Sequence, residues 1–91
     1  MDRRARARAL VVSALEAVEA ELSSPCHQLP AKQLGACRDG LWRYLDELDR
    51  GALSPRSDRD EALGRLIADT WGFDLPLAQL VLQAERAWRT C

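Results

Sequence analysis

Apolar side chains recur at helical spacing in four stretches of this chain, and nowhere do apolar and polar residues alternate as in a half-buried strand. At 91 residues the chain is long enough for one small core. Connections of about six or seven residues, and one tight turn at Gly72 and Phe73, suit neighbouring antiparallel helices. The sequence therefore predicts an all-α fold, a compact four-helix antiparallel bundle that forms a single helical domain over residues 1–91.

The first predicted helix runs from about Arg4 to Leu22, and the second runs from Pro30 to Arg50 with Gly51 as its C-terminal stop. Gly35 and Gly40, inside the second helix, are each costly unless they permit a close helix contact or a local bend. The inward faces are Ala7, Val11, Ala14, Leu15, Val18 and Leu22 in the first helix and Leu34, Cys37, Leu41, Tyr44, Leu45 and Leu48 in the second.

The third predicted helix opens at Ser57 or Asp58 and ends at Gly72, and Asp74 caps the fourth. Their apolar stripes are Leu63, Leu66, Ile67 and Trp71, then Leu77, Leu80, Val81, Ala84, Trp88 and Cys91. We expect one shared cluster of nearly fully buried side chains: Leu15, Leu41, Leu45, Leu66, Ile67, Val81 and Trp88.

The charges of the first predicted helix are reversed relative to its dipole. Its first turns carry Arg3, Arg4, Arg6 and Arg8, whereas its end carries Glu16, Glu19 and Glu21. Because a helix is positive at its N-terminus and negative at its C-terminus, both ends are unfavourable on their own. This pattern predicts a partner surface for the charged ends. In a twofold dimer of antiparallel first helices, these arginines would face the glutamates of a second copy. The alternative is a frayed, solvated arginine tail that touches nothing.

A second candidate interface is apolar. Trp42 lies at the edge of the stripe of the second helix, and Leu75, Ala78 and Leu82 project off the main stripe of the fourth. Tryptophan and leucine beside arginine are typical of an interface centre and rim. Ordinary packing, in a bundle whose helices are buried on two sides, explains the same residues equally well. We interpret Trp42, Leu75 and Leu82 as partner-binding residues.

Catalysis and metal binding have little support. Cys26, His27, Cys37 and Cys91 lack the paired spacing of a zinc site, and no neighbour is placed to activate a thiol. Cys37 falls on a core stripe, where cysteine behaves as a small hydrophobe. We therefore predict no enzyme activity, no catalytic residue, no metal and no cofactor. Three cysteines are an odd number, which favours reduced thiols in the cytoplasm.

Residues 66–82 offer an alternative, because their spacing resembles a helix-turn-helix DNA-binding motif. In that arrangement Ala78 and Val81 lock the second helix inside, and Gln79 and Gln83 can read base edges. Arg3 to Arg8 would then form an arm on the phosphates. A tight corner between two helices explains the same spacing.

The predicted function is a small non-catalytic protein–protein interaction module of an adaptor, regulatory or immunity-like kind. It acts through helix faces on a protein partner or by self-association as a homodimer. A net charge of −1 argues against a general binder of nucleic acid or membranes. Twelve arginines against one lysine, together with many alanines and leucines, indicate a bacterial, GC-rich origin.

Overall fold

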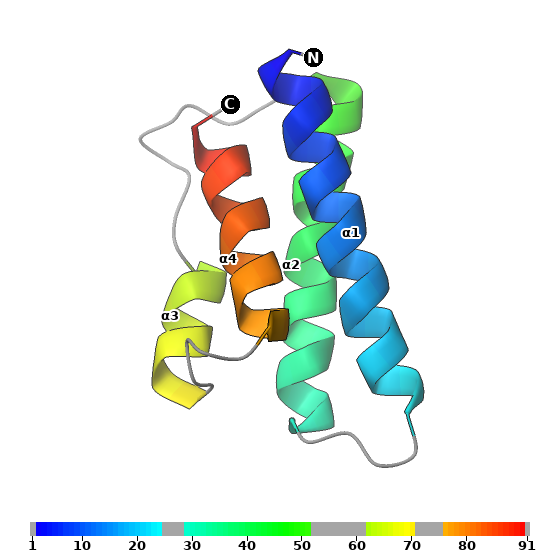
Figure 1. Cartoon of the computed structure of the whole chain (residues 1–91), viewed down its shortest axis with the longest axis vertical. Coiled ribbons are helices and arrows are strands. Elements are labelled where there is room, and N and C mark those ends of the chain that lie inside the picture. Colours follow the sequence, from blue (N-terminus) through cyan, green and yellow to red (C-terminus); the bar gives the residue numbers. More distant parts are fainter. Residues whose placement is uncertain (1, 25–28, 52–61, 71–75, 91) are drawn as a thin grey trace.

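The chain forms four helices, seen in a computed structural model that describes residues 2–24, 29–51, 62–70 and 76–90. They are α1 (Arg3–Ser23), α2 (Ala31–Arg50), α3 (Ala62–Thr70) and α4 (Pro76–Arg89) (Figure 1). The described residues contain no strand. The radius of gyration is 12.6 Å, which is that of a compact chain of this length. The predicted all-α class with four helices is therefore confirmed.

Helix α1 packs against two neighbours. It packs along α2, which runs in the opposite direction, and along α4, which also runs opposite to it (Figure 1). The short α3 packs mainly against α4 and touches α2. The N-terminus of α1 thus lies close to the C-terminal ends of α2 and α4 (Figure 1). This arrangement of helix ends positions the N-terminal arginines described below.

One hydrophobic cluster joins all four helices. The predicted inward faces of α1 and α2 are buried throughout, except for Leu22, which is half-buried. Six of the seven residues expected in the shared cluster are buried, and Leu66 is half-buried at its edge. The buried apolar residues are Ala7, Val11, Ala14, Leu15, Val18, Leu34, Cys37, Leu41, Tyr44, Leu45, Leu48, Leu63, Ile67, Ala78, Val81, Ala84 and Trp88.

Local signals at the ends of α1 and α2 act as the sequence suggests. The Asp2 carboxylate accepts a hydrogen bond of 2.7 Å from the Ala5 N–H and caps α1. Gly51 ends α2 in the left-handed region, with φ at 67°. Pro30 sits one position earlier than predicted, as the residue before the first turn of α2. At Gly40 an added Cβ would lie 2.9 Å from the Leu63 side chain, so this glycine permits the close contact of α2 with α3.

The buried face of α4 differs from the predicted stripe. Ala78 was predicted to project off the core and is instead fully buried, whereas Leu77 and Leu80 are only half-buried. The reason is that α1, α2 and α3 all pack against α4, so its buried face is wider and turned toward Ala78 and Glu85. The predicted caps at residues 57–58 and 74, the turn at 72–73 and residues 71 and 91 lie outside the described residues.

None of the helices in the described ranges is long and apolar enough to cross a bilayer.

Candidate functional site

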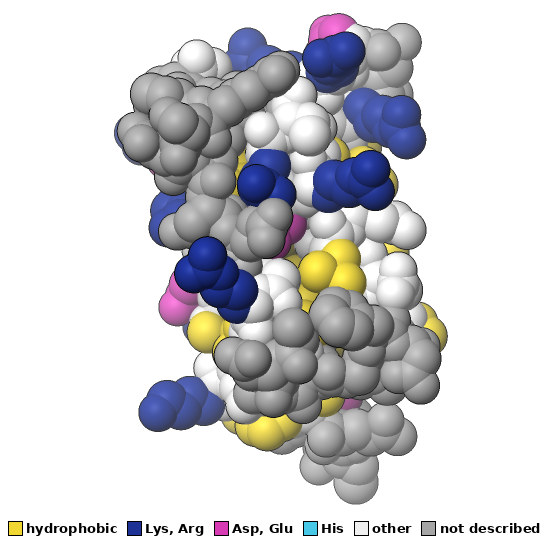
Figure 2. All heavy atoms as spheres, turned by 90° about the vertical axis from the view of Figure 1, so that its left-hand side faces the viewer, with side chains coloured by type: hydrophobic (Ala, Val, Ile, Leu, Met, Phe, Trp, Pro, Cys, Tyr) yellow, Lys and Arg dark blue, Asp and Glu magenta, His cyan; other side chains and the backbone are white. Residues whose placement is uncertain are grey.

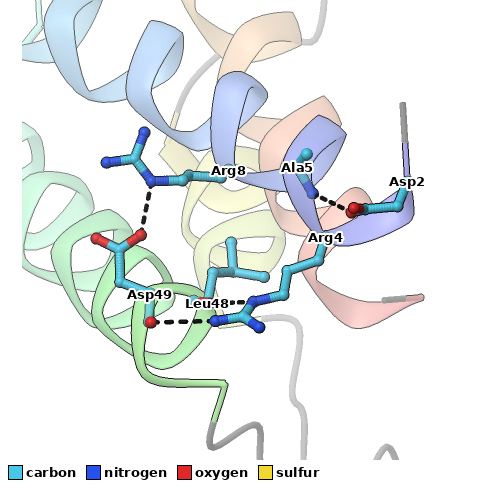
Figure 3. A network of polar contacts seen from close by, with 6 residues as sticks. All are labelled: Asp2, Arg4, Ala5, Arg8, Leu48 and Asp49. Atoms are coloured by element: carbon cyan, nitrogen blue, oxygen red, sulfur yellow. Dashed lines mark hydrogen bonds and ion pairs between the residues drawn. The ribbon is translucent and has the colours of Figure 1, made fainter.

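The start of α1 is bonded to the end of α2 (Figure 3). Arg4 donates from Nε to the Leu48 carbonyl oxygen at 2.5 Å and from Nη2 to the Asp49 carbonyl oxygen at 3.0 Å. Arg8 donates from Nε to Asp49 Oδ1 at 2.6 Å, which is also an ion pair. The two carbonyls belong to the last turn of α2, where backbone acceptors have no intrahelical donor. Arg4 therefore caps the C-terminus of α2 with its side chain.

These contacts explain half of the reversed charge pattern from within the chain. The guanidinium groups of Arg4 and Arg8 lie at the negative end of the α2 dipole and beside the Asp49 carboxylate. Gly51 leaves room for this arrangement, because an added Cβ would lie 3.2 Å from both terminal nitrogens of Arg4. Arg4 and Arg8 thus have partners in their own chain and need none outside it.

The other two N-terminal arginines line a groove between α1 and α4. Its volume is about 700 Å³. Arg3 and Arg6 of α1 line it together with Arg86 of α4, a residue that local sequence spacing does not connect with them. Figure 2 shows several Lys and Arg side chains on the face of the molecule that is on the left in Figure 1. The lining residues are Arg3, Arg6, Ala7 and Leu10 of α1 and Gln83, Arg86, Ala87 and Thr90 of α4.

Among the described residues, the only charged side chains that line the groove are arginines, and no ion pair engages Arg3, Arg6 or Arg86 there. The nearby Asp2 carboxylate is occupied as the N-cap of α1. Three guanidinium groups on one groove are suited to binding an anionic group, because each presents a planar fork of donors.

A buried carboxylate forms a second polar site, which the sequence analysis missed. Glu85 is only 4% exposed. Its Oε2 accepts hydrogen bonds from the Tyr44 hydroxyl at 2.8 Å and from the Leu63 N–H at 2.9 Å. Its Oε1 accepts from the Gly64 N–H at 3.0 Å. Because Leu63 and Gly64 lie in the first turn of α3, Glu85 supplies a cap for α3 from a different helix.

Aromatic rings complete the surroundings of Glu85. The rings of Tyr44 and Trp88 stack with centroids 4.0 Å apart and an interplanar angle of 17°. The Arg43 guanidinium lies 5.4 Å from the Tyr44 centroid and 5.9 Å from that of Trp88, within cation–π range. The position of Glu85 was a usable signal, since it lies four residues after Val81 and three before Trp88, both on the predicted apolar stripe.

Cys37 lies in the core near this carboxylate. Burial, and secondarily the negative charge of Glu85, raise the pKa of its thiol from 9.0 to about 12. The thiol is therefore protonated at neutral pH and is a poor nucleophile and metal ligand. Among the described residues no group of three or more His, Cys, Asp and Glu side chains gathers as a metal site. Cys26, His27 and Cys91 lie outside the described residues.

The remaining predicted site residues are dispersed. Glu16 and Glu19 are exposed on α1. Trp42 is 50% exposed on α2, and Leu82 is half-buried against the core. Leu75 lies outside the described residues. Among the predicted partner-binding residues that the structure describes, only Arg3 and Arg6 are brought together with a further cationic residue in one groove.

Comparison of the chain with protein-family models, with curated proteins and with solved structures gives no match.

Proposed function

We propose that this chain is a small non-catalytic protein–protein interaction module, built on a single antiparallel four-helix bundle. Its partner surface is the groove of Arg3, Arg6 and Arg86, with exposed Trp42 as a separate apolar contact. As part of the same proposal we place it in the cytoplasm of a bacterium. That placement is supported by the odd number of cysteines and by the preference for arginine over lysine.

The observation that carries the proposal is the unpaired positive charge of the groove. Elsewhere, Arg4, Arg8 and Arg50 meet acceptors or carboxylates of their own chain. The groove arginines have no such partner among the described residues, yet they surround apolar surface from Leu10 and Ala87. Arginine beside apolar side chains is the composition that protein interfaces favour.

Site-specific crosslinking tests the proposal. A photoreactive benzoylphenylalanine replaces Gln83 in the groove, and the same group at exposed Ala20 of α1 serves as the control. We expect protein adducts in cells from position 83 and few or none from position 20. Adducts in equal amount at both positions, or no protein adduct at position 83, would contradict the proposed function.

A helix-turn-helix over residues 66–82 is the second candidate function. The burial pattern favours it, because Ala78 and Val81 are buried while Gln79 and Gln83 are exposed, as that motif requires. The predicted turn falls within residues 71–75, outside the described residues. If the chain is a helix-turn-helix protein, it should bind duplex DNA with an affinity that falls steeply as salt is raised. The Gln79→Ala variant should then bind DNA with less sequence preference.

A further inference from the structure

The groove is elongated along two antiparallel helices. Its α1 residues are at positions 3, 6, 7 and 10, and its α4 residues are at positions 83, 86, 87 and 90. Both sets follow the spacing i, i+3, i+4 and i+7, which is one face of a helix over two turns. At 1.5 Å per residue, the groove therefore extends about 10 Å along each wall.

We infer that this groove binds an acidic amphipathic helix from a partner protein. The inference rests on the proposed function and adds the chemistry of the partner. Two helices side by side form a trough that accepts a third helix, and such helices are held by anchors at i, i+3, i+4 and i+7. The walls present that same spacing, so carboxylates one turn apart on the partner can meet Arg3, Arg6 and Arg86.

The lining of the groove also favours an apolar side chain between the carboxylates of the partner helix. Ala7 is fully buried, and Leu10 and Ala87 are half-buried, so these lining residues give the groove an apolar floor. An apolar side chain of the partner helix can contact this floor. Exposed ion pairs contribute little each. The apolar contact therefore supplies part of the affinity, while the arginines set the charge preference and orientation.

This lining favours a protein carboxylate over a nucleic-acid backbone. A phosphate backbone would leave the floor of Leu10 and Ala87 uncovered, and the net charge of −1 gives little general attraction for nucleic acid. Binding of DNA is therefore a distinct outcome of the test.

The test uses three labelled probes and fluorescence anisotropy with the full chain. The first probe is an alanine-based helical peptide with three glutamates at i, i+3 and i+7 and one leucine at i+4. The second has glutamine in place of each glutamate, and the third is a short DNA duplex. We expect the glutamate peptide to bind at least about tenfold more tightly than the glutamine peptide, and to weaken as salt is raised.

Arginine variants locate the binding. Arg3→Gln, Arg6→Gln and Arg86→Gln should each weaken binding of the glutamate peptide about two- to fivefold, and the triple variant should abolish it. Arg65→Gln is the matched control, because Arg65 is exposed on α3 and does not line the groove. Unchanged urea midpoints would show that the variants remain folded.

Three results would overturn the inference: equal binding of the two peptides, equal loss in Arg65→Gln, or tighter binding of the duplex. The proposed function is tested separately, by the crosslinking experiment. If position 83 crosslinks to a protein while the glutamate peptide does not bind, the module stands and the acidic helix is wrong.

Discussion

At the scale of single residues, the most consequential side chain of this protein is an ionisable group in its core. Glu85 accepts three hydrogen bonds, two of them from the backbone of α3. A buried carboxylate is costly unless such donors compensate its lost hydration. Its hydrogen bonds therefore tie three helices together through one residue.

Removal of this carboxylate should destabilise the fold. Glu85→Ala leaves the Leu63 and Gly64 N–H groups without an acceptor, and we expect a loss of about 2–4 kcal/mol in the free energy of unfolding by urea titration. Glu85→Gln should lose less, since one oxygen still accepts. Tyr44→Phe removes one donor and should cost only about 0.5–1.5 kcal/mol. A loss below about 1 kcal/mol in Glu85→Ala would show that the carboxylate does not hold α3.

The Cys37 thiol makes stability depend on alkaline pH. Its pKa rises from 9.0 to about 12 on folding, so between these values the unfolded chain binds fewer protons than the folded one. The free energy of unfolding should therefore keep its full value below pH 9 and fall above it, by up to about 1.4 kcal/mol per pH unit. Urea titrations from about pH 8 to 10.5 compare the chain that keeps Cys37 with Cys37→Ala, and Cys26 and Cys91 are replaced by serine in both. The free energy of unfolding should decline less steeply with pH in Cys37→Ala. Parallel declines would contradict this expectation.

At the scale of helices, the N-terminus of α1 and the C-terminus of α2 are one unit. Taken alone, the arginines of α1 oppose its own dipole. Beside α2, the same charges compensate a negative helix end and satisfy carbonyl groups of its last turn. The charge pattern therefore stabilises the pairing of the two helices and not either helix by itself.

Truncation of these arginines should follow their contacts. Arg4→Ala removes two hydrogen bonds to the α2 terminus and should cost about 1–2 kcal/mol in a urea titration. Arg8→Ala removes a half-exposed ion pair with Asp49 and should cost about 0–1 kcal/mol, less at high salt. Arg3→Ala is the control and should stay within about 0.5 kcal/mol of the parent, because Arg3 has no partner among the described residues. Equal losses for all three would show that capping is not their role.

At the scale of the whole molecule, the packing of α1 against α2 and α4 brings its start to the ends of both (Figure 1). The N-terminal arginines are thereby divided into two pairs. Arg4 and Arg8 stabilise the fold, whereas Arg3 and Arg6 join Arg86 in the groove. This division weakens the case for a homodimer held by all four arginines.

Light scattering should accordingly report the mass of a single chain at both low and high salt. Only Arg3 and Arg6 remain to meet Glu16, Glu19 and Glu21 of a second copy, and exposed ion pairs contribute about 0–1 kcal/mol each. A doubled mass at low salt that returns to one chain in Arg3→Glu with Arg6→Glu would instead establish the antiparallel dimer.

The sequence by itself determined the helices and most of the core. Periodicity placed every inward residue of α1 and α2 except Leu22, because burial along one face of a helix follows directly from its 3.6-residue repeat. It misjudged Ala78 on α4, where three neighbours bury a wider face than a single stripe.

Only the tertiary structure decided the partners of Arg4, Arg8 and Glu85. The Arg4 contacts span 44 and 45 residues of chain, and those of Glu85 span 41, 22 and 21. Nothing in local spacing encodes such separations. Hydrogen bonds and charge pairing act over a few ångströms in space, so the same arginine is a helix cap or a free binding group according to which helix end packing brings beside it.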